Sequence, residues 1–293
     1  MISISQEKNI FYYIHWVPSE KGPLVLDYGK EIIKEKSKDF YYNALNAIRI
    51  KTEKDNFIYS LSIDSNSVMC SETIVDDSFD HFDILNWFNE NTLGDQGNST
   101  NEIFHYQFSD NQKKYLNIYF KSNIKNKIKL FAQDYNSEIR NIGLGIFSAE
   151  ITARSIYNAD YNNSYAVLKV AKDSEVLVIS KGQLVSYLKF NVSNKKLGLK
   201  KIFGDKIVSK NFLKELENLI FNKNKKINSV EHLYFYQGKG KFKIIENLIT
   251  LKKTNITSMN IFSKLKLNNK KKMSDIDGMQ FAETGSSFWG IDV

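Results

Sequence analysis

Residues 165–190 read YAVLKVAKDSEVLVISKGQLVSYLKF and contain three apolar runs separated by short polar segments. The runs at 165–170, 175–180 and 184–190 are rich in Val, Leu and aromatic residues, a composition typical of β-strands. Lys181-Gly182 separates the last two runs and predicts a tight turn. This stretch therefore predicts three strands that open the second half of the chain.

The beginning of the chain repeats this strand-rich arrangement. Residues 10–16 (IFYYIHW) and 22–29 (GPLVLDYG) predict two strands joined by a turn that contains Pro18. In each half, helix and strand follow the opening strands, so the sequence predicts a duplicated α/β domain. We expect a helix over 38–50 and strands over 56–63 and 68–75 in the first half, and a helix over 205–222, a strand over 230–236, a turn over 238–240 and a helix or strand over 242–248 in the second.

The segment between these two series predicts further elements. Residues 79–91 form an amphipathic pattern with acidic residues near its start, which predicts a helix. A loop rich in Gly, Asn, Ser and Thr follows at 94–101. The remaining patterns predict strands over 103–108 and 115–120, a helix over 124–134, a short buried strand over 141–147, and a helix over 149–157 with Ser148 as its N-cap.

The length and composition of the chain limit its class. With 293 residues it exceeds the usual size of one hydrophobic core, so we expect two domains or one domain with a nested insertion. The single cysteine, Cys70, excludes an intramolecular disulfide and a thiolate metal cluster and favours a cytosolic protein. We find neither a secretory signal nor a run of about eighteen apolar residues, so we expect no membrane span.

The formal net charge of +8 raises the question of an anionic partner, because clustered lysines attract polyanions. No cluster combines a basic helix with aromatic residues that stack on bases. We therefore interpret the clusters as solvated loops and expect no nucleic-acid partner. They lie in the second half, at Lys195, Lys196, Lys200 and Lys201, at Lys223, Lys225 and Lys226, and at Lys270, Lys271 and Lys272.

The order of these elements resembles the PilM family of type IV pilus assembly proteins and the related cytoplasmic part of the type II secretion protein GspL. In that family a strand pair like 59–63 and 68–75 leads into a helix like 79–91, and together these form an inserted subdomain. The resemblance continues nearly to the end of the chain. Further matching segments are 116–120, Gly143-Leu144 with 150–153, 165–170, 180–184 and 281–285.

The resemblance implies an α/β fold of the actin-like (ribonuclease H-like) kind, in which one domain is duplicated. The first half is expected to span residues 1–158 and to include the inserted subdomain at about 52–120. The second half is expected to span residues 159–293.

Actin-like ATPases hold their nucleotide with hairpins that carry Asp and Gly, because only Gly lets backbone amides approach the phosphates. Here the stretch 3–9 takes the place of the first turn and 169–175 that of the second, and neither contains glycine. The turn on the adenosine side survives in part as residues 237–240 (QGKG). We therefore expect a pseudo-ATPase without a catalytic residue, and either no cofactor or ATP with magnesium.

Candidate residues for nucleotide binding remain in two of these segments, at Asp173, Ser174, Gly238 and Gly240. Asp173 together with Glu175 also offers hard oxygen ligands to the magnesium ion of a nucleotide. Asp, Ser and Gly are common in turns without a ligand, and that is the favoured interpretation of both segments. Metal-ligand spacing is absent among His15, His81, His105 and His232, and no nucleophile elbow surrounds Ser286 or Ser287, so we predict neither a metal site nor hydrolase chemistry.

Leu85, Trp87 and Phe88 lie on the apolar face of the helix predicted over 79–91. In the resembled family, a groove between this subdomain and the first domain receives a short cytoplasmic peptide of a single-pass membrane protein, PilN or its counterpart. The resemblance therefore implies that these three residues contact a partner peptide. The alternative is that they belong to the core, because large apolar residues on one helix face are usually buried.

The resemblance implies a cytoplasmic scaffold, peripheral at the inner face of the cell membrane, in the platform of a type IV pilus or a type II secretion-like machine. Its expected partners are the cytoplasmic segment of a PilN-like protein, components of the pilus or secretion motor, and further copies of itself. The alternative is an ATP-binding actin-like assembly protein whose nucleotide regulates partner binding. A sugar kinase is disfavoured, because we find no catalytic Asp within a Gly-rich sugar-binding stretch.

Overall fold

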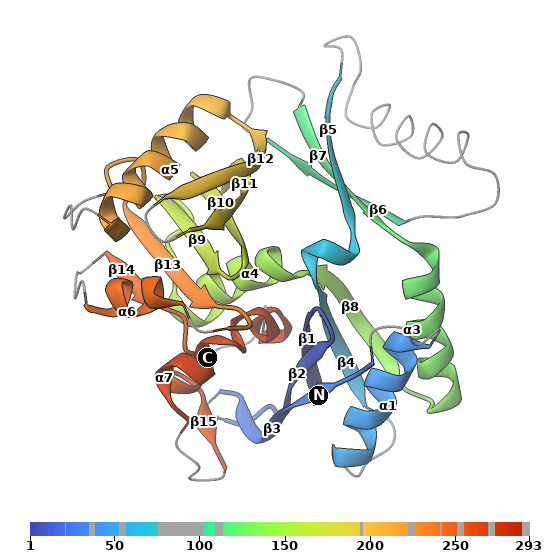
Figure 1. Ribbon diagram of the computed structural model, residues 1–293. Coiled ribbons are helices and arrows are strands. Elements are labelled where there is room, and N and C mark those ends of the chain that lie inside the picture. Colours follow the sequence, from blue (N-terminus) through green and yellow to red (C-terminus); the bar gives the residue numbers. More distant parts are fainter. Residues whose placement is uncertain are drawn as a thin grey trace.

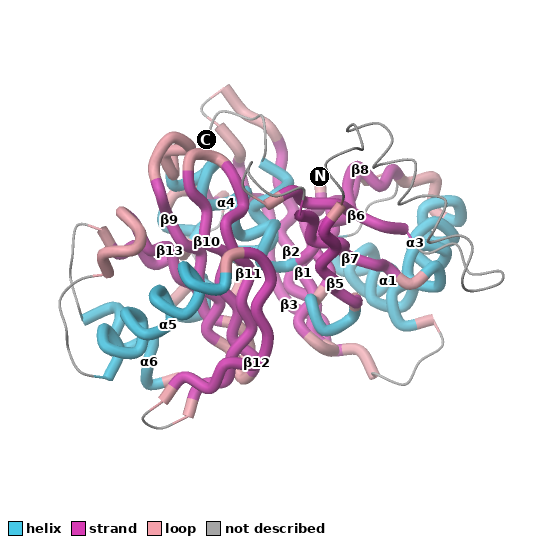
Figure 2. The backbone as a smooth tube through the Cα atoms, turned by 90° about the horizontal axis from the view of Figure 1, so that it is seen from above, coloured by secondary structure: helices cyan, strands magenta, loops and turns pink. Residues whose placement is uncertain are grey.

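The computed structural model describes residues 1–20, 22–34, 39–52, 57–75, 102–108, 114–193, 196–221, 227–240, 242–250, 255–268 and 273–288. Two six-stranded sheets lie on either side of a central helix, α4, and a separate three-stranded sheet stands at one end of the molecule (Figure 1, Figure 2). None of the helices in this part of the chain is both long and apolar enough to cross a bilayer.

The first sheet has the strand order β15-β3-β2-β1-β4-β8, antiparallel from β3 to β1 and parallel from β1 to β8. Strand β2 is buried along almost its whole length, because each face of this sheet is covered. Alternate side chains of β2 enter different cores: Phe11 and Tyr13 face one, and Tyr12 and Trp16 face the other. The strands are β1 (Ile2–Glu7), β2 (Ile10–Val17), β3 (Leu24–Ile32), β4 (Ile58–Ile63), β8 (Glu138–Leu144) and β15 (Lys266–Leu267).

The second sheet has the order β12-β11-β10-β9-β13-β14, antiparallel from β12 to β9 and parallel from β9 to β14. Its strands from β11 to β14 repeat those from β3 to β8, whereas the edge strands differ, since β15 is parallel to β3 and β12 is antiparallel to β11. The predicted duplication is therefore confirmed. The turn at Lys181 and Gly182 is also confirmed, with φ values of 46° and 74° that match the right-handed twist of a hairpin. The strands are β9 (Ser164–Val170), β10 (Asp173–Ser180), β11 (Gln183–Val192), β12 (Leu197–Gly204), β13 (His232–Gln237) and β14 (Ile256–Ser258).

Helices cover the outer faces of the two sheets (Figure 2). The helix α4 instead contacts β8 of the first sheet and both β9 and β10 of the second. It starts at Gly145, so Ser148 lies inside its first turn and is not the predicted N-cap. Strand and helix share one apolar run here, and apolar periodicity cannot locate a boundary within such a run. The helices are α1 (Phe40–Thr52), α3 (Ser122–Asp134), α4 (Gly145–Tyr157), α5 (Lys206–Phe221) and α6 (Lys243–Thr250).

Two sequence-based assignments near the start of the chain are wrong. Most of the stretch 3–9 is strand β1, and the turn is only Lys8-Asn9, where Lys8 has a φ of 56°. The stretch 59–63, assigned to the inserted subdomain, is strand β4 and pairs with β1 and β8. Apolar residues alternate with serines along both strands, but both faces are buried, so the alternation does not show which sheet each strand joins.

The three-stranded sheet is antiparallel in the order β5-β7-β6. Its strands are β5 (Met69–Ile74), β6 (Glu102–Gln107) and β7 (Lys114–Phe120), as the strand patterns predicted. The helix predicted over 79–91, with Leu85, Trp87 and Phe88, lies outside the described residues.

The last part of the chain returns from the second sheet to the first. It contributes β15, the short helix α7 (Asp275–Met279) and two 3-10 helices, η2 (Ile261–Ser263) and η3 (Ala282–Phe288). The helix η3 covers most of the segment 281–285 that matches the resembled family. The Phe281 ring packs against Tyr12 at 5.4 Å and Phe262 at 4.9 Å between ring centroids. The tail of the expected second half therefore belongs to the core of the first.

We predict that Phe281→Ala lowers the free energy of unfolding by about 3–5 kcal/mol, because it leaves a cavity among aromatic side chains in a well-packed core. Urea denaturation followed by fluorescence measures the change. The control is Ile249→Ala at a 40% exposed position of α6, where we expect a loss below about 1 kcal/mol. A loss for Phe281→Ala as small as that of the control would contradict the packing of the tail.

Candidate functional site

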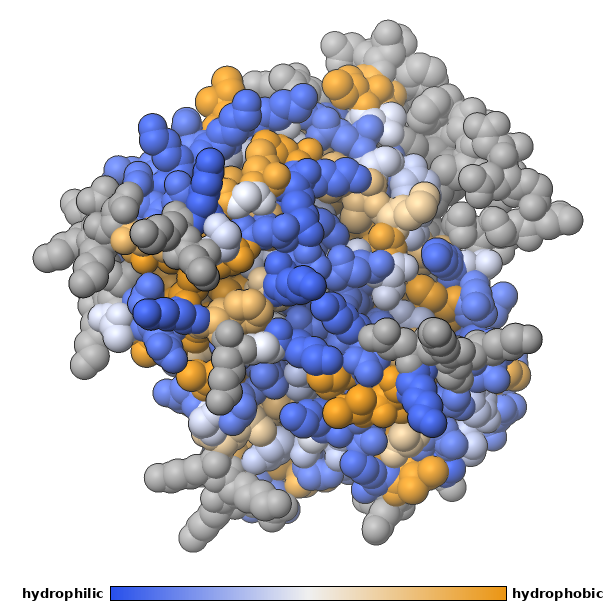
Figure 3. All heavy atoms as spheres, in the orientation of Figure 1, coloured by the Kyte–Doolittle hydropathy of each residue, from blue (hydrophilic) through white to orange (hydrophobic). Residues whose placement is uncertain are grey.

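Three turns converge where the two halves meet. They follow β1, β9 and β13, and they correspond to the hairpin and adenosine-side turns discussed above. The backbone N–H of Lys239 donates to the Glu7 carboxylate, and that of Lys8 donates to Asp64 Oδ2 at 2.6 Å. The cavity that remains among the turns measures about 20 Å³, which is room for about one water molecule. A hydrophilic band marks this meeting line on the front of the molecule (Figure 3).

A lysine occupies the centre of this junction. Lys169 on β9 is 4% exposed, and its Nζ lies 2.6 Å from Glu283 Oε1 in η3. The Tyr236 hydroxyl donates to the same oxygen at 2.8 Å. Burial opposes the charge of Lys169, but the nearby carboxylates of Glu283, Glu7, Asp64 and Glu175 together hold its pKa well above the ordinary value.

The carboxylates compete for this one ammonium group. Burial raises the pKa of Glu283 to about 7, although Lys169 lowers it. Burial also raises the pKa of Glu7, against the effect of Lys169. Glu7 and Asp64 come from the first half, whereas Lys169 comes from the second, so the cluster joins the two halves electrostatically.

Glu175 on β10 makes a second connection between the halves. Its side chain is almost fully buried and contacts Ser65 Oγ, which belongs to the turn after β4. Lys189 Nζ lies 3.3 Å from the same carboxylate and donates to the Ser65 carbonyl, also at 3.3 Å. These contacts join β10 and β11 of the second half to the turn after β4 of the first.

The residues predicted to bind a nucleotide lie at this junction, but their contacts stabilise the turns themselves. Asp173 pairs with Lys200, and the hydrogen bond from Lys200 lowers the pKa of Asp173. Ser174 Oγ closes its own turn, since it donates to the Ala171 carbonyl at 2.9 Å and accepts from the Ala171 N–H at 3.2 Å. Asp173 and Glu175 both line the cavity, yet no group of three His, Cys, Asp or Glu residues able to hold a metal is found among the described residues.

Gly238 and Gly240 are required for different structural reasons. A Cβ atom at Gly238 would collide with the Glu7 carboxylate, so this position needs glycine for the approach of the two halves. Gly240 has a φ of 120°, a conformation that other residues rarely adopt. Neither requirement depends on a nucleotide.

A groove runs along β6, between the three-stranded sheet and the body of the protein. Both β6 and β8 are edge strands of their sheets among the described residues, and a cavity of about 190 Å³ lies between them. Its walls are mostly apolar. They include Phe104, Tyr106, Ile118, Phe120, Ile142, Leu144 and Ile151.

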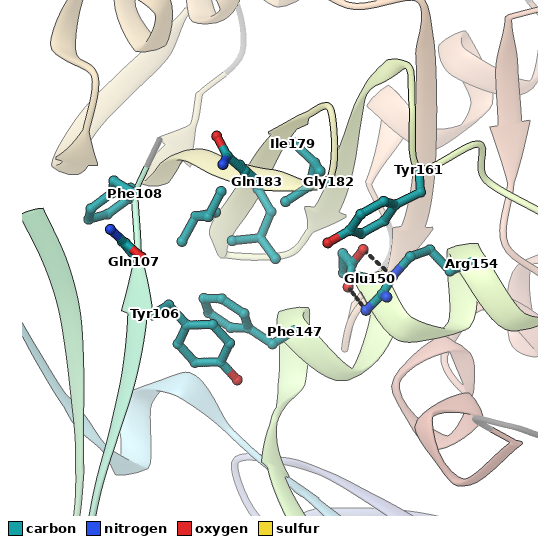
Figure 4. Close-up of a pocket in the computed structure, with 12 residues that line it drawn as sticks. Tyr106, Gln107, Phe108, Phe147, Glu150, Arg154, Tyr161, Ile179, Gly182 and Gln183 are labelled. Carbon is teal, nitrogen blue, oxygen red and sulfur yellow. Dashed lines mark hydrogen bonds and ion pairs between the residues drawn. The ribbon is translucent and has the colours of Figure 1, made fainter. Parts of the chain in front are cut away.

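A second cavity of about 240 Å³ continues beyond the Tyr106 ring, between β6, α4 and the hairpin of β10 and β11 (Figure 4). Tyr106 stacks on Phe147 with ring centroids 4.4 Å apart. At the far end Arg154 Nη2 donates to Glu150 Oε2 at 2.8 Å, and this ion pair leaves little net charge in the wall. We call these two cavities together the β6 groove.

Sequence reasoning missed the residues that organise the junction. Lys169 is the only charged residue of the apolar run YAVLKV, at its fifth position, and this exception to the pattern was the available signal. Glu283 is separated from Lys169 by 114 residues, so no local pattern connects the two. The expected groove next to the inserted subdomain has described walls on β6, β7, β8 and α4, whereas the helix proposed to line it lies outside the described residues.

We predict that Lys169→Met lowers the free energy of unfolding by about 3–5 kcal/mol, because it leaves buried carboxylates without their cation. Glu283→Gln costs less, because Lys169 keeps three other carboxylates nearby. In the double variant Lys169→Met/Glu283→Gln the loss is smaller than the sum of the two single losses.

Chemical denaturation measures these three losses. The control is Lys200→Ala, which removes a more exposed pair with Asp173 and costs below about 1 kcal/mol. Equal losses for the Lys169 and Lys200 variants would show that the buried cluster does not hold the halves together.

No family model matches the sequence, and no curated protein matches it either. A solved structure described as the PilM-PilN type IV pilus biogenesis complex contains a chain with the same fold: the TM-score is 0.60, the identity 8%, and the alignment covers 97% of this chain and 96% of that one. A Bacteroides thetaiotaomicron protein described as having an actin-like ATPase fold and unknown function aligns with a TM-score of 0.44 and 14% identity, over 95% and 94% of the two chains.

The cytoplasmic domain of EpsL, an inner membrane component of the type II secretion system of Vibrio cholerae, aligns with a TM-score of 0.44 and 6% identity, over 96% and 93% of the chains. Of these three structures, only the chain of the PilM-PilN structure aligns well enough to support a conclusion, and at 8% identity that conclusion is limited to the fold. Together with the duplicated topology, this alignment confirms that this chain has the actin-like fold.

Proposed function

We propose that this chain is a scaffold that docks a short extended segment of a membrane protein in the β6 groove and keeps its two halves closed without a nucleotide. The observation that carries the proposal is the groove itself, an apolar channel between two edge strands. Edge strands offer unpaired backbone groups to an added strand, and the apolar walls select its side chains.

The residue that follows β6 already forms one pairing of this kind. Phe108, directly after β6, forms a parallel bridge with Leu184 at the start of β11. A segment in the groove would extend along the remaining edge of β6 or along β8, with apolar side chains between Phe104 and Ile142. Within the described residues neither edge has a partner strand.

The kind of partner follows from the comparison. The similar fold belongs to a structure of a PilM-PilN complex, so we propose the cytoplasmic segment of a single-pass PilN-like protein as the occupant. Such a role places the protein in the cytoplasm at the inner face of the cell membrane, in a pilus or type II secretion-like platform. Motor components and further copies of the chain are the other proposed partners.

The proposed loss of nucleotide function follows from the junction. In an actin-like ATPase the phosphates and their metal lie between the hairpins. Here that position holds a lysine ammonium and a cavity with room for about one water, and the contacts of Glu7 and Glu175 join the halves directly. We therefore propose a pseudo-ATPase without a catalytic role for Asp173, Ser174, Gly238 or Gly240.

The second candidate function is an actin-like assembly protein that binds ATP and uses it to regulate partner binding. It is favoured by the convergence of the three turns and by the glycines retained at 238 and 240. Binding would require the contact between Glu7 and Lys239 to open.

We predict that Phe104→Asp and Ile142→Asp each weaken peptide binding at least tenfold, because a carboxylate in an apolar channel is costly to desolvate. The probe is a labelled synthetic peptide with the cytoplasmic sequence of a single-pass membrane protein encoded next to this chain, and fluorescence anisotropy measures its affinity.

The control is Leu199→Asp, which places the same charge at a 42% exposed position on β12, away from the groove. We expect binding by this variant to match that of the unmodified protein. Absence of binding to the peptide of every such neighbour, or equal effects of all three variants, would overturn the docking proposal.

We predict no saturable binding of ATP with magnesium by calorimetry at concentrations up to about 1 mM, since the cavity cannot hold a triphosphate while the turns remain joined. Inorganic triphosphate with magnesium serves as a second probe without adenosine. Magnesium-dependent ATP binding in the micromolar range would favour the second candidate function.

A further inference from the structure

The charge of this chain is divided unequally between its halves. Residues 1–158 carry 17 Lys and Arg against 21 Asp and Glu, whereas residues 159–293 carry 24 against 12. The net charge is therefore −4 in the first half and +12 in the second. Exposed clusters of basic residues are attracted to a negatively charged surface.

Helix α5 displays part of this charge as a stripe. Lys206, Lys210 and Lys214 are spaced four residues apart, so they lie along one side of the helix, and all three are exposed. Ile207 lies beside them and is 74% exposed, the highest value among the described large apolar residues. The opposite side of α5 is buried on the second sheet through Phe212, Leu216 and Leu219.

The acidic side chains near this stripe are engaged with backbone amides. Asp205 accepts hydrogen bonds from two N–H groups in the first turn of α5, at 2.8 and 3.0 Å. Glu215 accepts from the backbone of 228–229 at 2.9 and 3.0 Å, and Glu217 accepts from the Leu197 N–H at 2.7 Å. Among the described residues Lys206, Lys210 and Lys214 form no ion pair with a carboxylate, so the outer face of α5 stays basic, and it is mostly hydrophilic (Figure 3).

We propose that this face of α5 binds the surface of a bilayer that contains acidic phospholipids. Lys206, Lys210 and Lys214 would lie among the lipid phosphates, with Ile207 in the interfacial region. A bilayer accommodates both the positive charge and the exposed apolar side chain. Nucleic acid would use the lysines alone, and the described face of α5 carries no exposed aromatic ring for stacking on bases.

The position of α5 is compatible with the proposed docking function, although the lipid contact does not depend on it. Figure 1 shows α5 and the three-stranded sheet toward the same end of the molecule, opposite β15. A partner segment that leaves the bilayer could therefore reach the β6 groove while α5 rests on the lipid. The lipid contact of α5 and the partner segment in the β6 groove would then strengthen each other, because the first contact raises the effective concentration for the second.

Co-sedimentation with vesicles tests this proposal on the full chain without any partner. We expect binding to vesicles of phosphatidylglycerol and phosphatidylcholine, and none to vesicles of phosphatidylcholine alone. The triple variant Lys206→Glu/Lys210→Glu/Lys214→Glu should lower the partition coefficient roughly a hundredfold, from the usual contribution of each lysine at an acidic membrane. Ile207→Ser should lower it about tenfold through lost apolar burial.

The matched control is Lys121→Glu/Lys125→Glu/Lys129→Glu, which reverses three lysines of the same spacing at the start of and along α3 in the first half. This variant has the same net charge as the α5 triple variant, and we expect it to bind within about threefold of the unmodified protein. Thermal unfolding of each variant verifies folding, and Lys210→Gln with Ile207→Ser replaces the α5 triple variant if that one unfolds.

Equal losses from the α3 and α5 variants would overturn the proposal, since binding would then depend on bulk charge. It would also be overturned if Ile207→Ser bound vesicles as well as the unmodified protein while a duplex DNA oligonucleotide displaced the protein from them. Failure of the peptide experiment leaves this result unaffected, because no partner is present.

Discussion

The arrangement of the two halves depends on one buried ammonium group. Lys169 is surrounded by carboxylates from the first half, from its own sheet and from the C-terminal tail. A buried charge is stable only when it is paired and hydrogen-bonded. The removal of any one of these elements would therefore leave buried charges of the others without a partner. Burial raises the pKa of Glu7 and Glu283 while Lys169 lowers both, so these carboxylates share a single cation.

This cluster changes how an actin-like fold can work. In nucleotide-binding relatives of such a fold, phosphates and a metal supply the charges between the halves, and their release permits opening. Here the charges are supplied by side chains that cannot leave. The two sheets, with α4 packed between them, then provide a fixed body against which the three-stranded sheet forms the β6 groove. For the docking role proposed above, a preorganised groove would lose less entropy when a segment binds.

Much of the fold could be predicted from the sequence, and the errors have physical causes. The hairpins around Pro18 and Lys181 carry turn residues and alternating apolar patterns, so their strands were located correctly. The start of α4 was misplaced because strand and helix share one continuous apolar run, whereas β1 was assigned to a turn although its isoleucines alternate with serines. The contacts of the site residues were harder to predict than the strands. Asp173 and Gly238 were found as turn residues, but their actual contacts, Lys200 and Glu7, lie on other elements.

Local structure and its duplication follow from the sequence alone, because strand length, turn chemistry and helix periodicity depend on neighbouring residues. The uneven division of charge between the halves is also fixed in the sequence. Three features emerge only in the folded chain: Lys169 contacts Glu283, β6 and β8 leave a groove between them, and the tail packs on the first sheet. These relations join residues far apart in the chain, and they arise when the long-range contacts that bury the core bring the two sheets together.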